Sequence, residues 1–140
     1  MTYISDELKR FVIERAGGCC EYCLISQSSK LFAFEVDHII ALKHRGKTLE
    51  ENLCLSCLDC NRHKGSDFAS FDPETGEIVM LFNPRRDLWA NHFMLDGAVI
   101  GTKTPQGRVT EYLLHFNDAN RVVERAALIV ARAYPPVRPA

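Results

Sequence analysis

The chain of 140 residues contains no long apolar run, and its charges nearly cancel to a formal net charge of −1. A membrane-spanning helix needs about 20 successive apolar residues, so the sequence predicts none. The first 18 residues carry acids and lack the apolar core and cleavage site of a signal peptide. We therefore expect a cytoplasmic protein. The balanced charge also argues against a protein that coats nucleic acid without specificity through a basic surface.

The basic residues nevertheless gather in two blocks of the chain. Residues 38–65 carry five lysines and arginines against three acids, and residues 84–140 carry eight against five. Residues 66–83, between them, carry four acids and no lysine or arginine. Any contact with phosphate groups is therefore expected from the two basic blocks.

Six cysteines fall in two tight clusters: Cys19, Cys20 and Cys23, then Cys54, Cys57 and Cys60. The cytoplasm keeps thiols reduced, so the clusters predict a metal site rather than disulfides. The pairs Cys20/Cys23 and Cys57/Cys60 can place four thiolates around one tetrahedral zinc ion. Cys54 and Cys57 have the same spacing, which leaves the register open. We favour Cys57 and Cys60, because Cys54 alternates in an apolar run and is suited to burial, as is Cys19.

Apolar spacing and turn residues predict a chain that mixes helices with short strands. Helices are expected over residues 5–16 with Ser5 as the N-cap, just after Cys60, within 83–93 with Pro84 near the first turn, from 104 to about 115, and from 117 to 134. Strands are expected over 31–41, 52–56 and 78–82, with a hairpin at 93–101 turning at Asp96-Gly97.

A carboxylate and an imidazole stand side by side, as Asp37 and His38, in the otherwise largely apolar stretch "FEVDHII". Burying such groups without partners is costly, so the pair needs an explanation. Neighbouring strand residues point to opposite faces, and the two side chains can act together only where the strand ends or twists. The polar loop that begins near Lys43 is consistent with such an end.

Taken together, "CEYC", "VDHIIALKHRG" and "ENLCLSCLDCNRHKG" resemble the zinc-containing, four-cysteine type of HNH endonuclease. The resemblance covers residues 19–65 and implies an α+β fold built on a zinc-stabilised ββα-metal finger. We expect one domain over residues 1–140, with an N-terminal helix and a C-terminal extension of strands and helices over 66–140. The sequence departs from the family at Asn61, where the family name has a histidine, and at Ala41, where proline is common.

The resemblance also implies roles for individual residues. His38 is the expected general base, since an imidazole can accept a proton near neutral pH, and Asn52 is expected to fix the loop and help orient it. Asp37 and Asn61 are the expected oxygen ligands of a catalytic Mg²⁺ or Mn²⁺. His63 is an alternative third ligand, although we favour a solvated role for it. Phosphate contacts are expected from Lys43, Arg45, Arg62 and Lys64.

The expected activity is hydrolysis of phosphodiester bonds in DNA, with RNA left open as a substrate. A different class of function also fits the cysteines: a non-catalytic zinc module that binds nucleic acid or protein. Such a module has no need for Asp37, His38 and Asn61 together. Because all three are present, the sequence favours the endonuclease.

Overall fold

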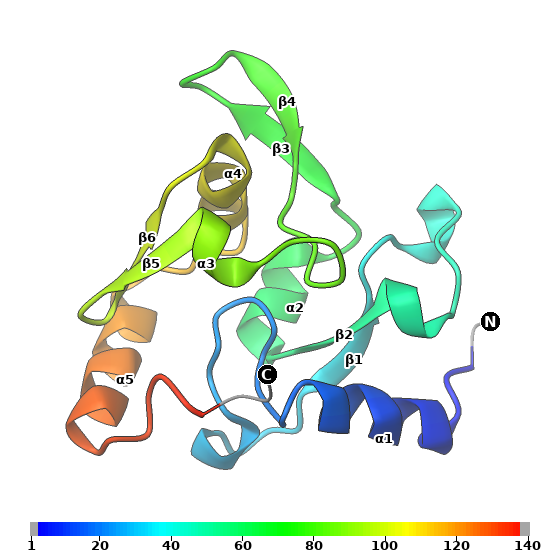
Figure 1. Ribbon diagram of the computed structural model, residues 1–140, viewed down its shortest axis with the longest axis horizontal. Coiled ribbons are helices and arrows are strands. Elements are labelled where there is room, and N and C mark those ends of the chain that lie inside the picture. The colour runs from blue at the N-terminus through cyan, green and yellow to red at the C-terminus, as the bar shows by residue number, and fades with distance from the viewer. Residues whose placement is uncertain (1–2, 138–140) are drawn as a thin grey trace.

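The computed structural model describes residues 3–137, along which helices and short antiparallel strands follow one another (Figure 1). The helices are α1 (Asp6–Arg15), α2 (Leu58–Lys64), α3 (Trp89–His92), α4 (Pro105–Leu113) and α5 (Ala119–Val130). The strands are β1 (Glu35–His38), β2 (Leu53–Ser56), β3 (Ala69–Asp72), β4 (Glu77–Met80), β5 (Phe93–Asp96) and β6 (Val99–Thr102). They pair as β1 with β2, β3 with β4 and β5 with β6. This mixture confirms the predicted α+β class.

Helix α1 begins and ends where its sequence predicts. The Ser5 hydroxyl accepts a hydrogen bond from the Leu8 backbone N–H at 3.1 Å, which caps the first turn. Gly17 and Gly18 have φ values of 63° and 70° and end the helix, because this left-handed backbone suits glycine. The inner face of the helix buries Val12 and Ala16 against β2.

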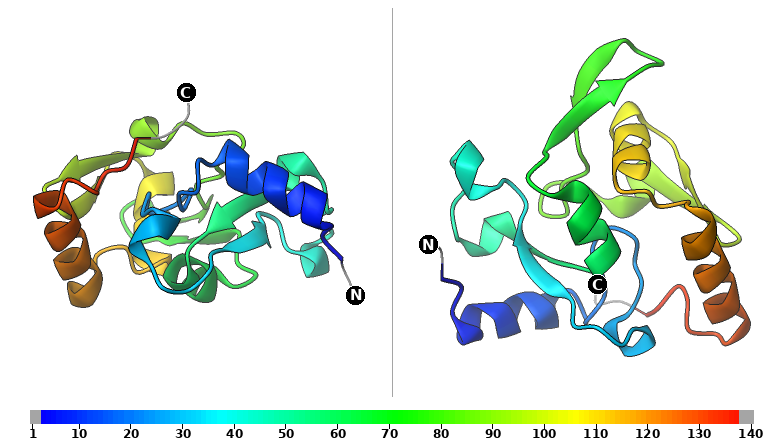
Figure 2. Two further views of the ribbon diagram at one scale, coloured as in Figure 1. Left: turned by 90° about the horizontal axis from the view of Figure 1, so that it is seen from below. Right: turned by 180° about the vertical axis from the view of Figure 1, so that it is seen from behind.

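The central unit consists of β1, β2 and α2, with α1 packed beside the strands (Figure 2). In the antiparallel register, Asp37 lies opposite Cys54 and His38 opposite Leu53. Leu53 and Leu55 therefore share one face of β2, where they pack with Val12 of α1. Alternate strand residues face the other way, so Asp37 and Cys54 lie on the opposite face of the β1–β2 pair.

The strand predicted over residues 31–41 is wrong at both ends. Before β1, the Gln27 side chain bonds the Phe32 carbonyl at 2.9 Å and the Phe34 N–H at 2.6 Å, which holds this segment as a loop. After β1, the Asn52 side-chain amide bonds both backbone groups of Ile40, each at 2.9 Å. In a longer strand these backbone groups would form hydrogen bonds with a neighbouring strand, but here they bond side chains instead.

The β3–β4 hairpin projects from the rest of the fold (Figure 1), and its first strand was not predicted. Two of its apolar side chains, Phe71 and Ile78, are 55% and 71% exposed. Such a hairpin gives little of the alternation by which a strand is recognised. It is tied to α4 by Asp72, which is buried and pairs with Arg108 at 2.9 Å.

Two local predictions in the C-terminal extension are wrong. Pro84 lies in a turn ahead of α3, because the backbone N–H of Asp87 bonds the Asn83 carbonyl at 2.8 Å and α3 begins only at Trp89. The hairpin turn is Gly97-Ala98, because Asp96 still pairs with Val99. Gly97 takes the positive φ of 57° that the turn requires.

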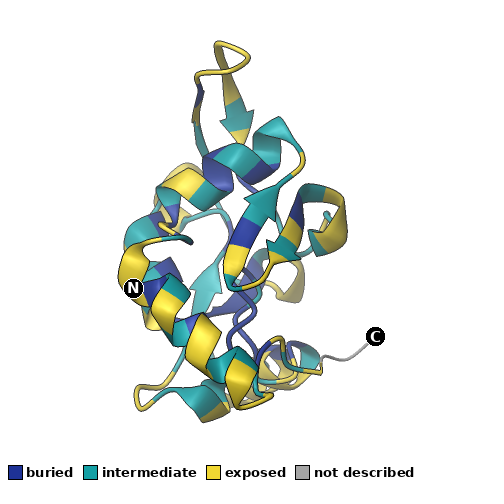
Figure 3. Cartoon of the chain, turned by 90° about the vertical axis from the view of Figure 1, so that its left-hand side faces the viewer, coloured by how far each residue is buried: buried dark blue, intermediate teal, exposed yellow. Residues whose placement is uncertain are grey.

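Helices α4 and α5 are both present, but each is shorter than predicted. Thr104 caps α4 by accepting from the Gly107 N–H at 2.9 Å. Asp118 holds the N-cap position of α5, and the Asn117 side chain bonds both backbone groups of Ile100 at 2.9 Å each. Buried residues run through the middle of the molecule, whereas the β3–β4 tip and the outer side of α1 are exposed (Figure 3). No helix among residues 3–137 is long and apolar enough to cross a membrane.

Candidate metal centres and catalytic strand

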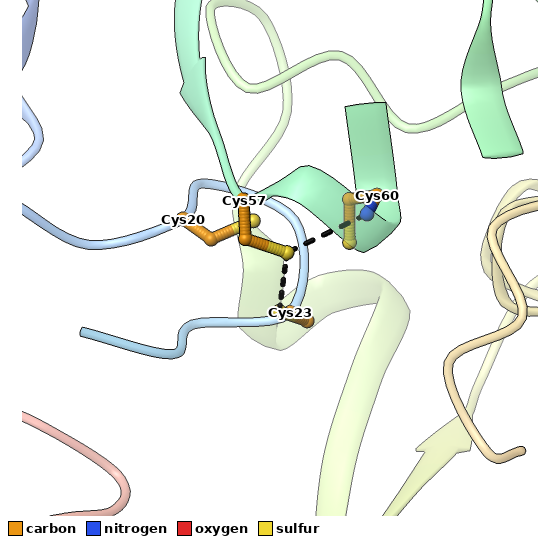
Figure 4. Close-up of side chains that lie close together, drawn as sticks. All are labelled: Cys20, Cys23, Cys57 and Cys60. Carbon is orange, nitrogen blue, oxygen red and sulfur yellow. Dashed lines mark hydrogen bonds between the residues drawn. The ribbon is translucent and has the colours of Figure 1, made fainter. Parts of the chain in front are cut away.

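Four thiols meet where the loop that carries Cys20 and Cys23 faces the start of α2 (Figure 4). The sulfur atoms of Cys20, Cys23, Cys57 and Cys60 all lie within 4.8 Å of one another, and all four residues are buried. Cys57 is also the N-cap of α2, and its sulfur lies 3.7 Å from that of Cys23. The chain therefore arranges four sulfur ligands for a single metal ion.

The electrostatics of the cluster suit a bound cation. Burial raises the pKa of the Cys20 and Cys60 thiols well above the usual value, whereas hydrogen bonds from its neighbours, Cys20 foremost, lower the pKa of Cys23. Four buried thiols cannot all ionise without compensating positive charge. A divalent metal supplies that charge and binds the thiolate form, so the donor set fits zinc.

Arg121 of α5 lies against the same sulfurs. Its guanidinium donates to the Cys60 sulfur at 3.2 Å and to the Cys57 sulfur at 3.9 Å, and the Leu114 carbonyl accepts from it at 2.8 Å. The residue is only 4% exposed, and the surrounding thiol groups raise its pKa despite burial. Sequence reasoning missed Arg121. The available signal was a pair of arginines, Arg121 and Arg125, spaced to lie on one face of the amphipathic α5.

Cys54 stays outside the four-thiol cluster. It is buried, and its thiol bonds the Tyr22 hydroxyl at 3.6 Å. Burial raises the pKa of Cys54 to about 12, so this thiol stays protonated. Cys19 is buried as well, and its sulfur donates to the Gly17 carbonyl at 3.4 Å.

Asp37 occupies the face of β1 that looks toward α2. Its Oδ2 atom is buried without a hydrogen-bond partner, and the nearest cation, the Lys64 ammonium, is 3.9 Å away. Burial raises the pKa of Asp37, and the attraction of Lys64 offsets this only in part. An ionised oxygen in this position still has the capacity to accept a donor or bind a cation.

His38 is the last residue of β1, where the strand gives way to the loop. Its Nε2 atom lies 2.9 Å from the Thr48 hydroxyl, which fixes the imidazole from the loop side. The His38 carbonyl also accepts from the Lys64 ammonium at 3.2 Å. Lys64 thus contacts both residues: its ammonium attracts the Asp37 carboxylate and donates a hydrogen bond to the His38 backbone carbonyl. Sequence reasoning missed Thr48, since nothing in the loop marks one hydroxyl among several polar residues.

Asn52 closes the loop that follows β1. Besides the two bonds to Ile40, its side-chain amide donates to the Lys47 carbonyl at 2.8 Å. Gly46 makes this packing possible, because a Cβ atom there would stand 1.7 Å from the Ile40 carbonyl oxygen. The loop that carries Thr48 is therefore held closely against the end of β1.

Helix α2 presents different residues to its two neighbours. Asn61 and Lys64 are three positions apart and share one side of the helix, the side from which Lys64 reaches Asp37 and His38. His63 instead stacks on His115 of the C-terminal extension, with ring centres 4.0 Å apart. His63, His115 and Asp118 bring ligand atoms within 4.8 Å of one another, so His63 belongs to a separate and mostly exposed group.

The expected phosphate-contacting residues divide into two kinds. Lys43, Arg45 and Arg62 are exposed, and none forms an ion pair with another residue in the range 3–137. Lys64 is only 2% exposed and is held by Asp37 and His38. Its ammonium therefore contacts the end of β1 from within, whereas the sequence predicts a phosphate contact for it.

With this geometry, residues 20–67 match the family model described as HNH endonuclease. This segment is an HNH domain. The match contains the cysteine cluster, the Asn52 loop and the ββα unit of β1, β2 and α2.

A second similarity extends over most of this chain and is to a curated protein. The Septu protein PtuB of Bacillus thuringiensis is 26% identical over 124 residues, which make up 87% of this chain and 46% of that protein. The chain thus spans about half the length of this relative. No solved structure is significantly similar to the chain.

Proposed function

We propose that the chain is a metal-dependent HNH endonuclease that hydrolyses phosphodiester bonds in DNA within the cytoplasm, and that residues 1–140 act as one domain. The observation that carries the proposal is the end of β1. There Asp37 Oδ2 is buried without a hydrogen-bond partner, 3.9 Å from the Lys64 ammonium. The same ammonium bonds the His38 backbone carbonyl, and Thr48 fixes the His38 ring. An acceptor oxygen beside a candidate base is the pairing that phosphodiester hydrolysis with an activated water requires.

The residues suit two different metals. The four thiolates form a soft, closed donor set, which favours a structural zinc ion. Asp37 and Asn61 offer hard oxygen atoms, and two protein oxygens leave room for the several waters that Mg²⁺ or Mn²⁺ retains. A divalent metal held there would polarise the scissile phosphate and stabilise the leaving 3′ oxygen.

In the proposed mechanism, His38 takes the proton from the attacking water. Thr48 engages Nε2 at 2.9 Å, so Nδ1 is the nitrogen we assign as the base. Asn52 holds the loop that carries Thr48 and thereby keeps the imidazole in place. Lys43, Arg45 and Arg62 contribute positive charge near the finger, where they contact the nucleic-acid backbone.

The direct test is nicking of supercoiled plasmid DNA. We expect cleavage with Mg²⁺ or Mn²⁺ and none after removal of these ions with EDTA, with zinc content measured in the same samples to establish that the four-thiol site stays loaded. Single-stranded RNA in a parallel assay compares the two substrates. A zinc-loaded protein that binds DNA but never nicks it in either metal would instead identify a non-catalytic binding module.

Thr48 gives a prediction about positioning. Thr48→Val keeps the shape of the side chain but removes the hydroxyl, so His38 loses its fixed orientation. We expect kcat to fall by about tenfold, the value of one ordinary hydrogen bond, with little change in KM. Thr48→Ser restores the hydroxyl and should recover most of the activity. A Thr48→Val enzyme with unchanged kcat would show that the loop does not position the imidazole.

Asn61 gives a prediction about metal demand. Asn61→Ala removes a neutral oxygen ligand, so the metal concentration for half-maximal cleavage should rise and the maximal rate should fall. Asn61→His offers a nitrogen ligand instead and should keep activity, with a shift toward Mn²⁺ or Ni²⁺. Cleavage titrated against each metal measures both effects. If His63→Ala demands more metal while Asn61→Ala does not, the third ligand is His63.

A further inference from the structure

Three buried side-chain atoms of residues 3–137 lack a hydrogen-bond partner: Asp37 Oδ2, Arg15 Nε and Arg85 Nη1. The first is the acceptor assigned above to the catalytic metal. The other two are both guanidinium donors, and both belong to residues that line one cavity of about 290 Å³. A buried N–H group without an acceptor is costly, so two such donors at one cavity point to an anionic ligand.

Both arginines are held in fixed positions at the cavity. Arg15, at the end of α1, donates to the carbonyls of Glu50 and Leu53 at 2.9 and 2.7 Å. Arg85 pairs with Glu21, and the second oxygen of Glu21 accepts from the Leu55 N–H at 3.0 Å. The guanidinium groups are therefore pre-ordered by β2, which lowers the entropy lost when a ligand binds.

The carboxylates that line the cavity are already engaged. Both oxygens of Glu21 are taken, and Asp87 accepts from the Asn83 N–H at 2.9 Å. Both oxygens of Glu21 and one of Asp87 thus accept hydrogen bonds, whereas Arg15 Nε and Arg85 Nη1 have no acceptor. Burial, and next the charge of Arg85, lower the pKa of Arg15, and an anion between the two arginines would relieve that repulsion.

The cavity adjoins the proposed catalytic strand. The contacts of Arg15 and Glu21 are made to Leu53 and Leu55 on β2, the strand that pairs with β1. Paired strands are separated by about 4.8 Å. Phe82 lines this cavity and also a smaller one lined by Lys64 and Ile39. The cavity is thus linked through β2 to the strand that carries Asp37 and His38, which makes a neighbouring phosphate of a bound backbone its candidate occupant.

We propose that the cavity lined by Arg15 and Arg85 binds a phosphate group, supplied by the nucleic-acid backbone next to the phosphate that is cleaved. The bidentate geometry of guanidinium suits phosphate oxygens. The choice of the backbone as the source rests on the proposed nuclease function. The recognition of phosphate itself rests only on the two unpaired donors.

The test measures binding of a fluorescent DNA duplex in a His38→Ala background, so that the result does not depend on turnover. The double variant Glu21→Gln/Arg85→Gln removes the guanidinium without changing net charge or leaving a lone buried carboxylate. We expect about tenfold weaker binding, typical of one charge-assisted contact, and a salt dependence reduced by about one counterion. Arg15→Lys keeps the charge but loses the Nε donor, and should weaken binding in the same direction.

Arg86→Gln is the matched control, because Arg86 is the exposed neighbour of Arg85 and does not line the cavity. It lowers the net charge, yet we expect less than a twofold effect on binding. Equal losses in Arg86→Gln and the double variant would overturn the proposal in favour of general surface charge. Unchanged binding of both the duplex and inorganic phosphate by the double variant and Arg15→Lys would also overturn it.

A second arm identifies the source of the phosphate. Thermal melting with inorganic phosphate should show stabilisation of the parent protein that the double variant lacks. If the variants lose this stabilisation but bind the duplex normally, the cavity binds phosphate from a free ion or nucleotide rather than from the DNA backbone. If the parent protein does not nick plasmid DNA but the variants still lose duplex binding, the proposed nuclease function is rejected and the phosphate site is retained.

Discussion

Replacing His38 by alanine is expected to reduce DNA cleavage by about 10²- to 10⁴-fold, the usual contribution of a general base. The fold and the metal content should be unchanged. His38 is half-buried, and its ring makes one side-chain hydrogen bond, to Thr48, so its loss costs on the order of 1 kcal/mol of stability. Plasmid nicking under saturating metal measures the first effect. Thermal melting and elemental analysis measure the second.

A histidine in the loop that follows β1 serves as the matched control. His44 is exposed and packs edge-on against Phe68, with ring centres 4.8 Å apart. His44→Ala should therefore cleave at nearly the parent rate. Turnover close to the parent value in His38→Ala, or an equal loss in His44→Ala, would contradict the role assigned to His38.

The finger was predictable from sequence because its geometry is local. Two residues between paired cysteines fix a tight loop, and alternation along "NLCLS" fixes which β2 residues face α1, namely Leu53 and Leu55. The N-cap of α2 is Cys57, where the second pair starts. These constraints act over a few residues, so a short stretch of sequence carries them.

Much of the support around the site was not predictable, because it joins residues distant in the chain. Arg121 reaches Cys60 across 61 positions, and Arg85 reaches Glu21 across 64. A sequence shows an arginine but not the partner that makes its burial tolerable. Lys64 is the clearest case. In sequence it reads as one more basic residue of the finger, yet its ammonium is buried beneath Asp37 and the His38 carbonyl.

Some strand and helix ends were predicted wrongly for a related reason. Side-chain amides of Gln27 and Asn52 bond backbone groups that a longer β1 strand would otherwise use. The Asn117 side chain bonds Ile100 of β6, so it is not available to cap α5. Propensity and periodicity describe the backbone alone and do not register such competition. The β3–β4 hairpin was half missed because it is held by an Asp72–Arg108 pair and by α4 rather than by a clear apolar face.

Replacing Cys57 by serine is expected to remove the metal and unfold the finger. The protein should contain one zinc per chain when purified without chelator, and the variant should contain almost none. Structural zinc contributes roughly 10–16 kcal/mol in isolated finger peptides, more than a domain of this size has in reserve. Loss of the ion would also leave Arg121 buried at 4% exposure against unmetallated thiols. Elemental analysis and thermal melting measure the two losses.

Cys54→Ser is the control that tests the register. Cys54 is also buried and also begins a pair with two intervening residues, but its thiol bonds Tyr22 and lies outside the four-thiol cluster. A serine there can keep the bond to the Tyr22 hydroxyl, so we expect full zinc content and a loss of only about 1–2 kcal/mol from burying a more polar group. Zinc retained in Cys57→Ser but lost in Cys54→Ser would show that the second ligand pair is Cys54 with another residue. Equal loss in both would mean that the fold of β2, rather than direct ligation, decides whether the ion is held.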